Sequence, residues 1–134
     1  MNNRSVLILS DKDESILTWM DAFRQRGLDA ASTASTSFAL NCWETDPPML
    51  TVVDLSLSVG DCLQVCRTLR AIDVAPILLI LPAARGEEIL DAFHAGVTEC
   101  LIQPNSPAVI LLKALAWSMR AGWDWPSGTS EMVQ

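Results

Sequence analysis

The sequence predicts an α/β fold in which helices cover both faces of a parallel sheet. Three observations support this prediction: apolar runs of strand length recur, segments with helical spacing separate them, and two runs end in acidic residues. Strand and helix alternate five times, as parallel strands joined by helical crossovers require. With 134 residues, the chain is long enough for one domain with a core on each side of the sheet.

The strands are predicted from short apolar runs. Continuous runs, which suit strands buried on both faces, predict central strands at Val6–Leu9, Met49–Val53 and Pro76–Leu81. Two weaker candidates lie at Leu28–Ser32 and Glu99–Ile102. Together these segments predict a sheet of five strands.

Four helices are predicted between the strands from apolar residues at helical spacing. Their markers are, helix by helix, Ile16, Leu17, Met20 and Phe23; Phe38 and Leu40 to Trp43; Leu63, Val65, Cys66 and Leu69; and the segment from Glu87 to Ala95. Gly27 and Gly96 can end the first and the fourth helix, and Pro47-Pro48 stops the second.

A fifth helix is predicted near the end of the chain. Asn105 or Ser106 can cap it, and apolar residues continue through Met119. They spread around more of the helix than one buried stripe needs, which indicates a contact surface or a covered helix. We expect a domain at residues 1–122 and a tail or linker start at residues 123–134, whose tryptophans could still pack back.

Composition excludes several classes of function. The net charge of −7 argues against a nucleic acid as a direct partner, because no basic stripe is present. No apolar run approaches the roughly 20 residues that cross a bilayer, and no secretory signal is apparent. The four cysteines fit a reducing compartment, so a cytoplasmic location and no membrane contact are expected. Cys62 and Cys66 lie one helical turn apart, but a core position is the better interpretation than a metal site.

Two acidic strand ends indicate where the functional site lies. Asp54 follows the apolar run Met49–Val53, and the cluster Asp11-Lys12-Asp13-Glu14 follows the run Val6–Leu9. Because the carboxyl ends of parallel strands share one edge of the sheet, these tips can meet there. The alternatives are a turn or capping role for Asp54 and an N-cap role for Asp11.

Two motifs carry a family resemblance. The stretch from Asp54 to Leu63 is similar to the loop D-L-x-L-P-x-x-D-G-L, with Ser58 in place of proline and Cys62 in place of glycine. The stretch from Ala92 to Pro104 is similar to A-x-x-A-G-A-x-x-Y-L-x-K-P. From about Val6 to Met119 the chain thus resembles the receiver domain of bacterial response regulators. The resemblance implies a flavodoxin-like, doubly wound, five-stranded parallel sheet of order 2-1-3-4-5 with five helices.

The resemblance also implies a function and a site. The function is two-component phosphorelay signalling with a histidine kinase or another signalling protein as partner. Asp54 stands at the place of the phospho-accepting aspartate. Asp11, Asp54 and the backbone carbonyl of Ser56 would hold Mg²⁺, to which these oxygen ligands are suited. Ser10 replaces one acid of the family's pair, and its hydroxyl would contribute weakly, through water.

The chain departs from the family at three further positions. Pro82, or Leu81 one position earlier, replaces the family's Thr or Ser, and Gln103 replaces its lysine; neither replacement restores the lost hydroxyl or charge. Cys100 stands where the family has an aromatic switch residue. One acid and one lysine are lost together, so the formal charge balance of the pocket is expected to be unchanged.

These departures predict an atypical receiver whose phosphorylation is weak or absent. Its partners, including a second copy in a homodimer, would bind the face formed by the fourth helix, fifth strand and fifth helix. Two alternatives are a conventional phospho-accepting receiver with altered output and an Mg²⁺-dependent phosphohydrolase using Asp11 and Asp13. A flavin or nucleotide binder is disfavoured, because the turn after the first strand lacks glycine. We therefore expect no enzymatic activity.

Overall fold

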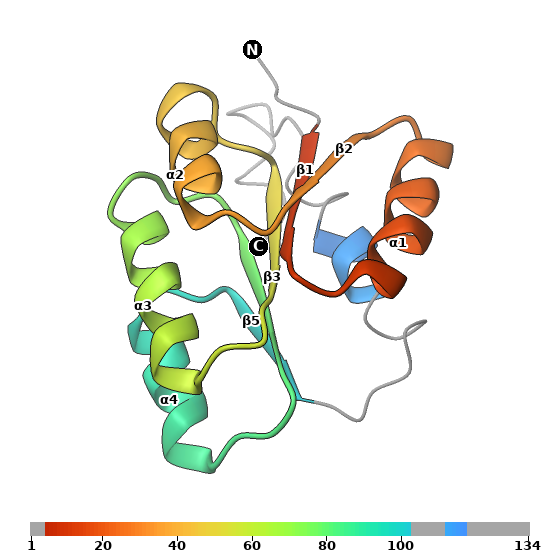
Figure 1. Cartoon of the computed structure of the whole chain (residues 1–134). Coiled ribbons are helices and arrows are strands. Elements are labelled where there is room, and N and C mark those ends of the chain that lie inside the picture. The colour runs from red at the N-terminus through yellow and green to blue at the C-terminus, as the bar shows by residue number, and fades with distance from the viewer. Residues whose placement is uncertain (1–4, 103–111, 118–134) are drawn as a thin grey trace, which may run out of the picture.

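The sheet consists of five parallel strands, and the computed structural model describes residues 5–102 and 112–117. The strands are β1 (Ser5–Ser10), β2 (Asp29–Thr33), β3 (Leu50–Asp54), β4 (Ile77–Leu81) and β5 (Glu99–Ile102). Their order in the sheet is β2-β1-β3-β4-β5, with every neighbouring pair parallel (Figure 1). This arrangement confirms the doubly wound, flavodoxin-like sheet that the sequence predicts.

Helices form a layer on each side of the sheet. They are α1 (Asp13–Gln25), α2 (Thr36–Thr45), α3 (Val59–Arg70), α4 (Gly86–His94) and a helical segment at residues 112–117. Helix α1 and segment 112–117 cover one face, whereas α2, α3 and α4 cover the other (Figure 1). The predicted cap of the fifth helix, its end at Met119 and the tail at residues 123–134 lie outside the described residues. Within the described ranges, no helix has the length and apolar character needed to cross a membrane.

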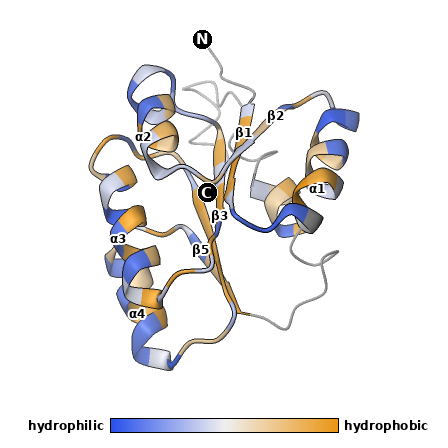
Figure 2. Cartoon of the chain, viewed as in Figure 1, coloured by the Kyte–Doolittle hydropathy of each residue, from blue (hydrophilic) through white to orange (hydrophobic). Residues whose placement is uncertain are grey.

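Each face of the sheet has its own apolar core. Side chains alternate along β1, so that Val6 and Ile8 pack towards α1, while Leu7 and Leu9 pack towards α2, α3 and α4. Hydrophobic residues accordingly dominate the strands, whereas the helices combine hydrophobic and hydrophilic residues (Figure 2). The central strands are therefore buried on both faces, as their continuous apolar runs predict.

Helix α1 differs in one detail from its sequence pattern. Leu17, one of the four residues that mark the helix, is 72% exposed, whereas Trp19 is buried. Ile16, Trp19 and Phe23 are spaced by three and four residues, so they share the buried stripe from which Leu17 points away.

Two glycines end helices as predicted. Gly27 follows the C-cap of α1 with φ 78°, and Gly96 follows the C-cap of α4 with φ 97°. A Cβ at Gly96 would collide with the side chain of Arg70. The Arg70 guanidinium donates hydrogen bonds to the carbonyls of Gly96 (2.8 Å), Asp73 (2.9 Å) and Ala75 (2.7 Å). Arg70 thereby ties the end of α3 to the loops that enter β4 and β5.

The register between β1 and β3 positions the candidate site. Ser10 and Asp54, the last residues of the two strands, are paired directly. The two acidic tips of the sequence therefore lie side by side at one edge of the sheet, as expected.

Candidate functional site

Asp54 is a buried carboxylate at the end of β3. The residue is 2% exposed, and the preceding residues of β3 are fully buried. A buried ionised carboxylate is unfavourable unless a charged or hydrogen-bonding group compensates it. The partner of Asp54 therefore determines what this site can do.

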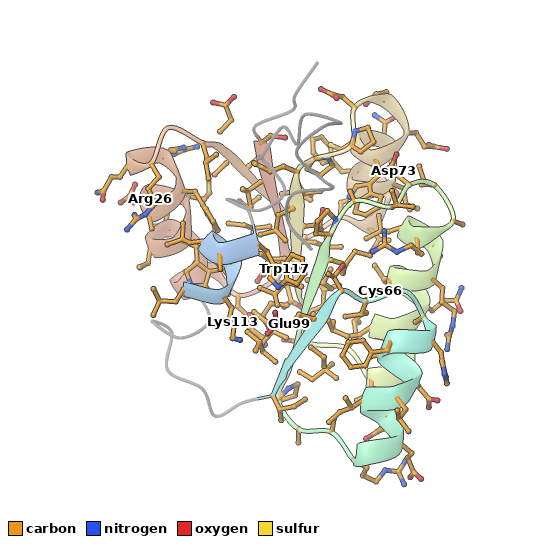
Figure 3. All side chains as sticks on the ribbon, turned by 180° about the vertical axis from the view of Figure 1, so that it is seen from behind. Arg26, Cys66, Asp73, Glu99, Lys113 and Trp117 are labelled. Atoms are coloured by element: carbon orange, nitrogen blue, oxygen red, sulfur yellow. The ribbon has the colours of Figure 1, made fainter. Side chains whose placement is uncertain are left out.

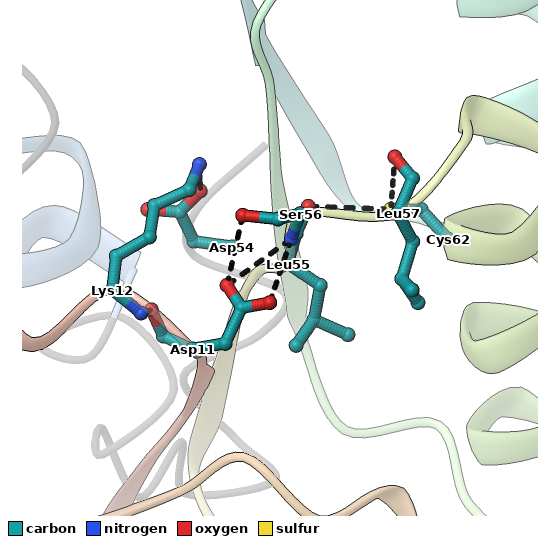
Figure 4. A network of polar contacts seen from close by, with 8 residues as sticks. Asp11, Lys12, Asp54, Leu55, Ser56, Leu57 and Cys62 are labelled. Carbon is teal, nitrogen blue, oxygen red and sulfur yellow. Dashed lines mark hydrogen bonds and ion pairs between the residues drawn. The ribbon is translucent and has the colours of Figure 1, made fainter.

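Lys12 is that partner among the described residues. Its Nζ atom lies 2.6 Å from Asp54 Oδ1, and its side chain is 32% exposed (Figure 4). Lys12 is the N-cap residue of α1, and its backbone N–H donates to Ser10 Oγ at 3.0 Å. The ammonium therefore reaches Asp54 from the loop between β1 and α1.

The expected charge balance of the pocket is wrong because it leaves out Lys12. Asp11, Asp54 and Lys12 together carry a formal charge of −1, from two carboxylates and one ammonium. The signal in the sequence is a lysine inside an acidic cluster, directly after a strand end. Sequence reasoning missed it because the side chain of such a lysine can equally well point into solvent.

Asp11 joins the two loops at the sheet edge. Its carboxylate accepts the backbone N–H of Ser56 at 3.1 Å to each oxygen, and Oδ1 also accepts Ser56 Oγ–H at 3.2 Å (Figure 4). The alternative in which Asp11 caps α1 is wrong, because Lys12 occupies the N-cap position. Asp11 instead fixes the β1–α1 loop against the β3–α3 loop.

The loop after Asp54 is held by local side chains. Ser58 is the N-cap of α3, and its Oγ accepts the backbone N–H of Asp61 at 3.1 Å, which is a favourable role for serine. The Cys62 thiol lies 3.8 Å from the carbonyl oxygen of Leu55 and 3.9 Å from that of Leu57. Ser58 and Cys62, the two departures in this motif, thus have structural roles.

Two of the four cysteines are core thiols. Cys62 and Cys66 are fully buried, which confirms their interpretation as core residues. Burial, followed by the nearby Cys62, raises the pKa of Cys66 to about 12, and burial also raises the pKa of Cys62 and Cys100. Protonated thiols are poor metal ligands. In the part of the chain that the structure describes, no three His, Cys, Asp or Glu side chains form a metal-binding group.

The end of β4 lies on the other side of β3 from Asp11. The buried Leu81 ends the strand, and the exposed Pro82 follows it. Neither residue has a hydroxyl, and proline has no N–H to donate. Gln103, the predicted replacement of the family lysine, lies outside the described residues.

Of the predicted site residues, the structure brings together Ser10, Asp11, Asp54 and Ser56 at one edge of the sheet. It adds Lys12, which the sequence did not predict as a site residue.

The donor types at this edge fit Mg²⁺. The carboxylates of Asp11 and Asp54 and the backbone carbonyl of Ser56 are oxygen ligands, which Mg²⁺ prefers. In the structure, however, each carboxylate already has a partner: Asp11 contacts Ser56, and Asp54 contacts Lys12. An ion that bound both carboxylates would compete with these contacts.

One curated protein is similar in sequence along nearly the whole chain. No family model matches the sequence. The chain is 31% identical over 134 residues to the alkaline phosphatase synthesis transcriptional regulatory protein PhoP of Bacillus subtilis, covering 97% of this chain and 54% of that protein. The chain thus spans about half the length of this curated relative.

Solved structures share the fold. A response regulator from Burkholderia pseudomallei, with a phosphorylated aspartic acid, a calcium ion and citrate, matches with a TM-score of 0.69 at 19% identity, covering 87% of this chain and 69% of that one. The beryllofluoride-activated NtrC4 receiver domain dimer matches with a TM-score of 0.73 at 15% identity, covering 88% and 98%.

The fold and these comparisons together show what the chain is similar to. The chain has the flavodoxin-like fold that these receiver domains share, and its sequence is similar to that of the transcriptional regulatory protein PhoP.

Proposed function

We propose that this chain is a receiver domain of the response-regulator type, and an atypical one that acts mainly through protein–protein contacts. Phosphorylation of Asp54 is weak or absent in this proposal. Three features support it: Lys12 is paired with Asp54, Ser10 stands in place of an acid, and Pro82 offers no hydroxyl. The domain is then a non-enzymatic signalling module whose partner is a histidine kinase, another signalling protein or a second copy.

The observation that carries this proposal is an exposed apolar surface on both sides of β5. On α4, Leu90 is 61% and Phe93 49% exposed, and Leu112 at the start of the helical segment is 65% exposed. Figure 3 shows β5 between α4 and segment 112–117. Exposed apolar side chains on elements that flank one edge strand can form a protein contact site. We call Leu90, Phe93 and Leu112 the β5-flanking surface.

Polar contacts hold the helical segment against β5. Glu99 of β5 forms an ion pair with Lys113 at 3.1 Å, and it accepts a hydrogen bond from Trp117 Nε1 (Figure 3). The helical segment is thereby tied to β5. A preorganised surface loses less conformational entropy when a partner binds, which supports its role as an interface.

The proposal favours a second copy of the chain as one occupant of this surface. The similar NtrC4 receiver domain is a dimer. Self-association needs an apolar patch that can face its own copy, and the β5-flanking surface provides one.

The proposal places the domain in the cytoplasm and excludes a nucleic acid as its direct partner. Free thiols persist in compartments that keep cysteines reduced, and all four cysteines of the chain are free. The net charge of −7 would repel a phosphate backbone.

The second candidate is a conventional, Mg²⁺-dependent phospho-accepting receiver with altered output. The position of Asp54 at the end of β3 favours it, and the similar Burkholderia protein carries a phosphorylated aspartic acid and a calcium ion. Asp11, Asp54 and the Ser56 carbonyl would hold Mg²⁺, with Ser10 assisting through water. The ion would supply positive charge to the phosphoryl oxygens, a charge that Gln103 and Pro82 do not supply.

Substituting the β5-flanking surface tests the interaction proposal. Leu90→Asp is expected to weaken self-association by about tenfold or more, because it buries a charge in an apolar contact. The free energy of unfolding should change by only about 0.5 kcal/mol, because Leu90 is exposed. Sedimentation equilibrium of the whole chain gives the dissociation constant, and urea unfolding gives the stability.

Leu17→Asp is the matched control. Leu17 is also an exposed leucine, but it lies on α1, outside the β5-flanking surface. Its substitution should leave association unchanged, and Asp54→Asn should do so as well. Equal effects of Leu17→Asp and Leu90→Asp, or loss of association in Asp54→Asn, would contradict the proposal.

A further inference from the structure

The pair of Lys12 and Asp54 places a positive charge inside the acidic pocket. Nζ of Lys12 lies 2.6 Å from Oδ1 of Asp54, whose side chain is only 3% exposed. An ammonium is a compact charge with three donors, and this distance is that of a charge-assisted hydrogen bond. The contact therefore compensates the buried carboxylate.

The backbone around Lys12 directs its side chain to Asp54. The Lys12 N–H is held by Ser10 Oγ at 3.0 Å, and Ser10 is the register partner of Asp54. The neighbouring carboxylate of Asp11 is turned towards Ser56, with both oxygens 3.1 Å from its backbone nitrogen. Asp11 therefore does not compete with Asp54 for the ammonium (Figure 4).

We propose that the Lys12 ammonium is the resident cation of this pocket and that a divalent ion binds Asp54 only by displacing it. An ammonium and a divalent ion repel each other, and both need the Asp54 carboxylate. With Lys12 in place, the two carboxylates and the ammonium carry a formal charge of −1; without it, the charge is −2. Lys12 thus lowers the affinity of the pocket for Mg²⁺.

Displacement of Lys12 requires only a side-chain movement. Its side chain is 32% exposed, so its ammonium can reach solvent while the backbone contacts with Ser10 remain. This inference rests on the proposed assignment of Asp11, Asp54 and the Ser56 carbonyl as the ligands of the ion. It explains why phosphorylation of Asp54 would be weak.

Titration of the whole chain with Mg²⁺ tests the inference. Lys12→Met keeps a flexible apolar side chain of similar length and removes the charge, so its dissociation constant for Mg²⁺ is expected to be about tenfold lower or more. Isothermal titration calorimetry measures this constant. The rise of the thermal unfolding midpoint with Mg²⁺ concentration provides an independent measure, because an ion that binds only the folded state stabilises it.

Three further variants test whether the gain in Mg²⁺ affinity depends on the charge of Lys12 and on the carboxylate of Asp54. Lys113→Met removes the same charge at the ion pair with Glu99 and should bind Mg²⁺ like the unmodified chain. Lys12→Arg keeps the charge and should also leave the affinity unchanged. Asp54→Asn, added to Lys12→Met, should abolish the gain, because it removes the carboxylate.

The inference is overturned if Lys12→Met binds Mg²⁺ no more tightly than the unmodified chain, including the case in which neither binds. It is also overturned if the gain survives Asp54→Asn. Lys12→Gln, which keeps a donor for Asp54 but no charge, serves the same test should Lys12→Met not fold. A variant that gains Mg²⁺ affinity but accepts no phosphoryl group would support this inference and contradict only the phospho-accepting alternative.

Discussion

Trp43→Ala is expected to lower the free energy of unfolding by about 4 kcal/mol. Trp43 of α2 is fully buried in the core between the sheet and α2, α3 and α4. Its Nε1 donates to Thr51 Oγ1 at 2.9 Å, and the Arg70 guanidinium carbon lies 6.0 Å from its ring centroid. The substitution would leave a large cavity and remove the donor to a buried hydroxyl. Urea unfolding followed by far-ultraviolet circular dichroism measures the loss.

Trp43→Phe separates packing from hydrogen bonding. It keeps an aromatic ring in the core but leaves Thr51 Oγ1 without this donor, so we expect a loss of roughly 1–3 kcal/mol. If Trp43→Ala lowered the free energy of unfolding by less than Trp43→Phe does, the packing of Trp43 between α2 and β3 would not stabilise the fold as the structure indicates.

Lys12→Met is expected to lower the free energy of unfolding by roughly 2 kcal/mol. Removing one partner of a buried ion pair leaves an uncompensated charge, which typically costs about 3–5 kcal/mol, and the partial exposure of Lys12 reduces this loss. The double variant with Asp54→Asn removes both charges. Its loss of unfolding free energy should therefore be smaller than the sum of the losses of the two single variants. Urea unfolding of all four proteins, without divalent ions, gives the coupling energy.

Lys113→Met is the control for this cycle. The side chains of Lys113 and Glu99 are 50% and 25% exposed, so that pair is worth less than about 1 kcal/mol. If the losses of unfolding free energy for Lys12→Met and Asp54→Asn were additive in the double variant, Lys12 would not be the counter-ion of Asp54.

Most of the fold could be predicted because strand and helix patterns determine it locally. Continuous apolar runs identified β1, β3 and β4, and the two glycines with positive φ marked the ends of α1 and α4. Leu17 was harder to place, because the apolar residues of α1 extend beyond its buried stripe. Only the packing against the sheet decides that Trp19, and not Leu17, faces the core.

The candidate site was predictable in position but not in its contacts. The parallel sheet alone brings Asp11 and Asp54 to one edge. The partners of these carboxylates depend on loop conformation, which the sequence pattern does not specify. The N-cap position of Lys12 and the turn of Asp11 towards Ser56 arise from backbone hydrogen bonds in these loops.

Asp54 is expected to be a poor phospho-acceptor, and intact mass spectrometry measures this property. The unmodified chain and Asp54→Asn are incubated with acetyl phosphate and Mg²⁺, and both are shown to be folded by circular dichroism. We predict that at most a minor fraction of the unmodified chain gains one phosphoryl group, and that Asp54→Asn gains none. Phosphorylation of most of the unmodified chain, but not of Asp54→Asn, would contradict weak phosphorylation of Asp54 and establish a conventional phospho-accepting receiver.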